Sequence, residues 1–92
     1  MKDVTVAVDY EAAASIHENG IVILHTGNGR MYAANETGAR IWSGLAQQKP
    51  LHTIATEISD EYQVPITSAR EHVSAFMDDL EGHSLIRREE NL

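Results

Sequence analysis

The chain has 92 residues and a mass of 10.2 kDa, which suits one compact domain with a thin hydrophobic core. Fourteen acidic residues against seven basic ones leave a formal net charge of −7, which argues against DNA or RNA as the main partner because nucleic-acid-binding surfaces are basic. The absence of cysteine excludes disulfide scaffolds, thiolate zinc sites and cysteine nucleophiles. Met1–Tyr10 lacks the apolar core of a signal peptide, and no run approaches the roughly 20 apolar residues of a membrane span. We therefore expect a cytoplasmic protein that needs no membrane.

Three strands are predicted in the first third of the chain. Val4–Val8 alternates β-branched and small residues, which is the period of a half-buried strand. Tyr10–Asn19 is rich in alanine and predicts no definite element. Ile21–His25 and Arg30–Ala34 flank a turn in which Asn28-Gly29 can supply the positive φ angles of a tight hairpin. The first arm of this hairpin is apolar throughout, so we expect both of its faces to be covered.

Three helices are predicted in the remainder of the chain. Asn35 can cap a first helix that ends near Gln47–Lys49 and places Trp42 in the core. Pro50 suits the first turn of a second helix, whose apolar stripe runs to Tyr62. Gly38 and Gly44 lie inside the first helix and indicate close backbone contacts there.

A third helix is predicted to open at Ser68-x-x-Glu71, read as a capping box, and to end at Gly82. Leu85 and Ile86 can still pack against the core. The apolar face of this helix comprises Ala69, Val73, Phe76, Met77 and Leu80.

These elements predict a single α+β domain over residues 1–92. It divides into a β-sheet part over 1–35, a three-helix part over 36–86 and a charged tail over 87–92. A three-stranded antiparallel β-sheet followed by three α-helices is the layout of a winged helix-turn-helix, which is an architecture and not an activity.

Catalytic and metal-binding patterns are not evident. No two of the five histidines are spaced to place both imidazoles on one helix face, so we expect no metal site. No serine stands in a Gly-x-Ser-x-Gly context, and the pair Asp78-Asp79 diverges around a helix. Gly27-Asn28-Gly29 fits a hairpin turn better than a phosphate cradle. We expect neither an enzyme nor a cofactor.

DNA binding is the activity that this architecture itself suggests. The helix that would enter the major groove is the third, and Arg70 is its only basic residue beside four acids. Such a helix is repelled by phosphate, so a winged-helix DNA-binding regulator remains only an alternative.

An exposed sheet edge is the remaining functional feature. If the first strand pairs elsewhere, Arg30–Ala34 lies at the edge of the sheet and can accept an extended peptide as an added strand. Met31 and Met77 extend the apolar faces of elements that we expect to be neighbours, and methionine suits a surface that repacks around a guest chain, although both can equally fill a small core.

The stretch Gly29-Arg30-Met31-Tyr32-Ala33-Ala34-Asn35-Glu36-Thr37-Gly38-Ala39-Arg40-Ile41-Trp42 resembles the G-R-x-Y-x-L-N-x-T-G-A-x-I-W segment of PqqD-like proteins. These are the recognition elements that bind precursor peptides of ribosomally synthesised, post-translationally modified peptides. The resemblance covers about two thirds of the chain, with Ala34 in place of the usual leucine. Its Thr-Gly-Ala-x-Ile-Trp wording is most similar to the stand-alone recognition proteins of lasso-peptide biosynthesis.

The resemblance implies a non-catalytic protein that binds the leader of a precursor peptide by β-strand addition and presents it to a leader peptidase and a macrocycle-forming cyclase. A peptide chaperone of pyrroloquinoline quinone biosynthesis is the close alternative, and a subunit that only scaffolds a larger enzyme is another. On the third helix we favour the flank with Arg70 and Met77 over the flank with His72 and Asp79. The expected peptide-binding residues are Arg30, Met31, Tyr32, Ala33, Ala34, Arg70, Val73, Ser74, Met77 and Glu81.

Overall fold

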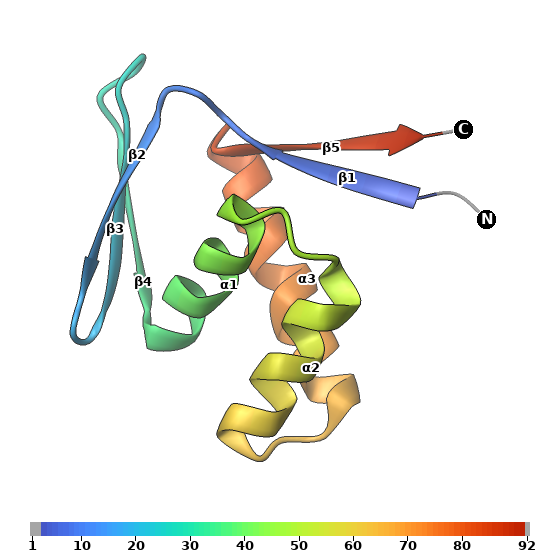
Figure 1. Cartoon of the computed structure of the whole chain (residues 1–92). Coiled ribbons are helices and arrows are strands. Elements are labelled where there is room, and N and C mark those ends of the chain that lie inside the picture. Colours follow the sequence, from blue (N-terminus) through green and yellow to red (C-terminus); the bar gives the residue numbers. More distant parts are fainter. Residues whose placement is uncertain (1–2, 92) are drawn as a thin grey trace.

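The computed structural model describes residues 3–91, with side chains described over 6–88. Its elements are β1 (Asp3–Val8), β2 (Ala12–His17), β3 (Gly20–His25), β4 (Met31–Asn35), α1 (Glu36–Ala46), α2 (Leu51–Tyr62), α3 (Ile66–Gly82) and β5 (Ile86–Asn91). Figure 1 shows a three-stranded sheet beside the helices, and a two-stranded sheet that runs across one end of them. The predicted α+β class, with a three-stranded antiparallel sheet and three helices, is confirmed.

The three-stranded sheet has the order β2-β3-β4, so its membership differs from the prediction. The strand β2 lies in the alanine-rich segment for which the sequence predicted no element. It pairs with β3 from Ala12↔His25 to His17↔Gly20. The strand β1, which was expected in this sheet, is not part of it.

The predicted hairpin between β3 and β4 is present, with a longer turn than Asn28-Gly29 alone implies. The His25 amide donates to the Arg30 carbonyl at 2.9 Å, which leaves four residues in the turn. Only Gly29 among them has a positive φ, of 74°. The expectation that β3 is covered on both faces is wrong: Ile21 and Ile23 are buried, whereas Leu24 on the other face is 37% exposed.

The expected charged tail is a strand. Residues 86–91 form β5, which pairs antiparallel with β1 from Val8↔Ile86 to Asp3↔Asn91. Leu85 and Ile86 are buried, as predicted. The Arg88 guanidinium also pairs with Asp78 of α3 at 2.5 Å, so β5 is held against the third helix.

The first two helices begin where the sequence predicts. Asn35 caps α1, because its side-chain oxygen accepts the Gly38 amide at 3.0 Å. Pro50 immediately precedes α2. The start of α3 was misplaced: the helix begins at Ile66 after Pro65, so Ser68 is already inside it and makes no cap hydrogen bond.

The core lies where α1, α2 and α3 meet the inner face of β3. Trp42 is 5% exposed and belongs to this core, as expected. The predicted apolar face of α3 is buried throughout. The core comprises Ile21, Ile23, Ala39, Ile41, Trp42, Leu45, Ile54, Ala55, Ile58, Ala69, Val73, Phe76, Met77, Leu80, Leu85 and Ile86.

Candidate functional site

The strand β4 is one edge of the three-stranded sheet, which is the position that strand addition requires. Backbone pairs in an antiparallel ladder alternate between hydrogen-bonded and non-hydrogen-bonded. Because His25 bonds to Arg30, the residues of β4 that bond to β3 are Tyr32 and Ala34. The backbone N–H and C=O groups of Met31 and Ala33 therefore point away from the sheet.

A hollow of about 360 Å³ lies beside this edge, between β4, the start of α1 and one flank of α3. Tyr32 and Ala34 project into it from β4. Its apolar lining includes Ile41 and Phe76, which are almost fully buried. We call this hollow the β4 groove; its lining residues are Tyr32, Ala34, Asn35, Thr37, Gly38, Ile41, His72, Ala75, Phe76 and Asp79.

Tyr32 joins β4 to the far end of α3. Its hydroxyl donates to Asp79 Oδ2 at 3.3 Å, and its ring packs edge-on against His83 with centroids 4.8 Å apart. The Phe76 ring lies 6.0 Å away, centroid to centroid. Partial burial, followed by the negative charge of Asp79 and the hydrogen bond to it, raises the pKa of Tyr32 above its ordinary value. The phenol therefore stays neutral and keeps its proton for Asp79.

The predicted site residues on β4 divide between the two faces of the strand. Tyr32 and Ala34 face the β4 groove. Met31 is 67% exposed and, like Ala33, lies on the opposite face of the sheet from the helices. Arg30 is exposed in the turn before the strand. Any contribution of Met31 and Ala33 to the groove comes from their backbone and not from their side chains.

The structure places the α3 residues that the sequence favoured away from β4. Arg70, Val73, Ser74 and Met77 do not line the β4 groove; they line a separate hollow of about 320 Å³ between α2, α3 and β5. Glu81 lies near Arg88, with 3.6 Å between the carboxylate and the guanidinium. Met77 is 2% exposed and packs in the core, so it is not a neighbour of Met31. The flank that faces β4 carries His72, Ala75 and Asp79.

The contribution of α1 to the groove was also missed. Asn35, Thr37 and Gly38 line it because α1 begins directly at the end of β4. A methyl group at Gly38 would come within 2.7 Å of the Ala34 methyl and 3.1 Å of the Phe76 ring. The signal in the sequence was Gly38 within a predicted helix. It indicated a close contact, but it did not indicate that the contact is with β4 and α3.

One group of potential metal ligands occurs among the described residues. Oxygen and nitrogen atoms of Asp9, Glu11 and His25 lie within 4.8 Å of one another. Asp9 Oδ1 accepts the Glu11 amide at 2.8 Å, and His25 Nδ1 accepts the Gly27 amide at 3.1 Å. These contacts hold the loops at one end of the sheet, so we assign the group a structural role.

Comparison with known proteins places this geometry in a family. The family model described as Coenzyme PQQ synthesis protein D (PqqD) matches residues 20–86, from the start of β3 to the start of β5. The chain belongs to the PqqD family. The search of curated proteins gives no match. None of the described helices has the length and apolar character needed to cross a membrane.

Two solved structures share the PqqD-family fold of this chain. One is described as "TbiB1 in Complex with the TbiA(beta) Leader Peptide"; it has a TM-score of 0.82 and 23% sequence identity, with 88% of this chain and 94% of that chain covered. The other is described as "Lasso peptide synthetase B1 complexed with the leader peptide". Its TM-score is 0.82 and its identity 22%, with 90% of this chain and 98% of that chain covered.

Proposed function

We propose that this PqqD-family protein binds the leader of a ribosomally synthesised precursor peptide, of the lasso type, by β-strand addition to β4, and that it performs no chemistry itself. The observation that carries the proposal is the open backbone edge of β4 beside an apolar groove. The structural relatives, which are described as complexes with leader peptides, support the same use of the fold.

Strand addition explains how one site combines affinity with selectivity. The free backbone groups of Met31 and Ala33 give hydrogen bonds that any extended peptide can form. Alternate side chains of the added strand then point toward the helices, where Ile41 and Phe76 favour an apolar group. His72 and Asp79 stand at the exposed rim, where they can select polar neighbours of that group.

Once bound, the precursor is presented in the cytoplasm to a leader peptidase and a macrocycle-forming cyclase. The description of the matched family favours a second candidate, in which the guest is the precursor peptide of pyrroloquinoline quinone biosynthesis. DNA binding is disfavoured, because α3 carries Arg70 as its only basic residue against four acidic ones.

The test is an NMR titration with the synthetic leader peptide of a lasso precursor, and in parallel with a quinone-cofactor precursor peptide. We expect the leader to shift the amide signals of residues 31–35 and of His72, Ala75 and Asp79. The discriminating variant is Ala33→Pro, which removes a free N–H without removing a bond to β3 and so is tolerated at an edge. We expect it to abolish leader binding.

The matched control is Ala14→Pro, the same change on the other edge strand of the same sheet. It is expected to leave the affinity for the leader unchanged. Equal loss of affinity in both variants, or shifts confined to the hollow around Arg70 and Met77, would reject strand addition at β4. Tighter binding of the quinone-cofactor precursor than of the leader would favour the second candidate.

A further inference from the structure

The structure has a second open edge, and we propose that it is a docking site for a partner protein. The strand β2 forms the other side of the three-stranded sheet. We infer that it accepts an extended segment of the partner in which basic and apolar residues alternate. The site is separate from the β4 groove, so this inference goes beyond leader binding and does not depend on which peptide β4 takes.

The backbone of β2 is available for pairing. The alternation fixed by the His25–Arg30 hydrogen bond makes Ala13, Ser15 and His17 the residues of β2 that bond to β3. The N–H and C=O groups of Ala14 and Ile16 therefore face outward. The edge lacks two of the usual protections, because its sequence Ala-Ala-Ala-Ser-Ile-His contains no lysine and no proline.

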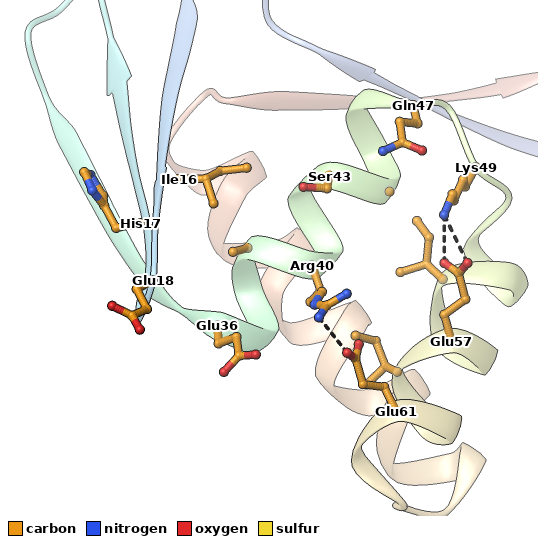
Figure 2. Close-up of a pocket in the computed structure, with 14 residues that line it drawn as sticks. Ile16, His17, Glu18, Glu36, Arg40, Ser43, Gln47, Lys49, Glu57 and Glu61 are labelled. Atoms are coloured by element: carbon orange, nitrogen blue, oxygen red, sulfur yellow. Dashed lines mark hydrogen bonds and ion pairs between the residues drawn. The ribbon is translucent and has the colours of Figure 1, made fainter.

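An amphipathic hollow adjoins this edge on the helix side. Its volume is about 550 Å³, and it lies between the end of β2, α1 and α2. Figure 2 shows Ile16 pointing from the sheet toward α1, while His17 points away. Ile16 is 60% exposed, and the buried Ile54 and Ile58 contribute to the lining across from it. An added strand would place alternate side chains between these apolar groups.

The charges around the hollow determine which partner fits. Arg40 is paired with Glu61 at 2.6 Å and Lys49 with Glu57 at 3.0 Å, so both basic groups of the rim are neutralised. Among the described residues no ion pair involves Glu18 or Glu36, which both line the hollow. The unbalanced charge is therefore negative. Glu18 lies in the turn that ends the β2 edge and Glu36 at the start of α1, so basic side chains at the end of an added strand meet this charge while its apolar side chains enter the hollow. A second copy of this chain, with its net charge of −7, would bring acid against acid.

The probe is the peptide acetyl-Lys-Val-Lys-Ile-Lys-Val-Lys-amide, titrated into the full chain and followed by NMR. We expect shifts of the amide signals of Ala12–His17 and slower hydrogen exchange at Ala14 and Ile16, because their N–H groups become paired. The same peptide with glutamate in place of lysine is expected not to bind. Ala14→Pro should abolish binding of the basic peptide, whereas Ala33→Pro should leave it unchanged. Binding of the basic peptide at β2 can thus be observed even if leader binding at β4 fails.

A charge reversal provides the second variant. Glu18→Lys lies in the exposed turn after β2 and is expected to weaken binding about two- to fivefold, the range of an exposed charge pair. Glu71→Lys makes the same change on α3, outside both grooves, and serves as the control. Equal affinity in Glu18→Lys and Glu71→Lys, shifts confined to β4, or a peptide-independent dimer that Ala14→Pro dissolves would each overturn the proposal. Such a dimer would identify a second copy as the occupant.

Discussion

Tyr32 is the residue that connects β4 to α3, and its ionisation is a direct readout of that contact. Burial is the main cause of its raised pKa, and Asp79 adds both charge repulsion and a hydrogen bond. We expect Asp79→Asn to lower the pKa of Tyr32 only in part, because burial remains. A ¹³C NMR titration of the tyrosine Cζ signals measures this change. Tyr10, whose raised pKa comes first from its hydrogen bond to Glu11, is the internal control and should not move.

The raised pKa of Tyr32 sets the pH range over which its neutral phenol stabilises the folded protein. A pKa that is higher in the folded state than in the unfolded one favours the neutral phenol on folding. The contribution of Tyr32 to folding stability is therefore fully present below its unfolded-state pKa of about 10. It is lost as the pH rises through the raised pKa of the folded state. Leader affinity should show no step from Tyr32 between about pH 6 and 9. A Tyr32 pKa that Asp79→Asn leaves unchanged would contradict the proposed coupling.

Gly38 sets how closely three elements meet. Replacing glycine by alanine inside a helix normally stabilises it by up to about 1 kcal/mol. At Gly38 the added methyl would lie 2.7 Å from the Ala34 methyl and 3.1 Å from the Phe76 ring, so α1 would have to move away from β4 or α3. Overpacking of this kind costs about 1–3 kcal/mol. We expect Gly38→Ala to lower the free energy of unfolding, measured by urea denaturation.

Gly82 offers the matched substitution. It lies in the last turn of α3, and a methyl group there meets no atom within 4 Å. Gly82→Ala should therefore leave the protein equally stable or slightly more stable. If Gly38→Ala raised stability as Gly82→Ala is expected to do, helix propensity and not the close approach at Gly38 would govern this position.

The contrast between helices and strands explains how much of the fold the sequence could predict. The helices α1 and α2 were placed correctly because a 3.6-residue stripe and a cap such as Asn35 are local signals. The strand β2 has no alternation to detect: five of its six residues are exposed, and it is a strand because β3 lies beside it. Likewise, Ser68 resembled a cap because the motif is local, whereas the helix had already begun after Pro65.

The candidate site was predictable to a similar extent. The β4 edge followed from the hairpin and the strand order. Periodicity gave the core line of α3 and its two flanks, but not the side of that helix on which the sheet lies. Only the packed arrangement shows that His72 and Asp79 face β4 while Arg70 and Met77 face α2 and β5. The flank is a property of the whole molecule and not of the helix.

At the scale of the whole molecule, the terminal strands β1 and β5 pair with each other, and all of their residues except Ile86 lie outside the segment that matches the PqqD family model. The sequence Arg-Arg-Glu-Glu resembled a solvated tail because charged residues rarely form strands alone. Here the partner strand supplies the hydrogen bonds, and Arg88 adds pairs with Asp78 and Glu81. The edge of the three-stranded sheet that we assign to the leader is untouched by this pairing.

A chain that ends after Ile86 tests the separation between this pairing and the site. It loses most of the β1–β5 ladder and the Arg88 ion pairs but keeps the buried Leu85 and Ile86. With a net contribution of about 0.5–1.5 kcal/mol per hydrogen bond, we expect the free energy of unfolding to fall by about 2–4 kcal/mol. Arg88→Gln, which removes only the pairs with the exposed carboxylates of Asp78 and Glu81, should cost about 1 kcal/mol or less. Urea denaturation measures both changes. Calorimetric titration should show unchanged leader affinity in the shortened chain under conditions where that chain is folded.

A shortened chain as stable as the full one would show that β5 contributes nothing to the stability of the domain. A folded shortened chain with weakened leader binding would show that the β4 groove depends on β5.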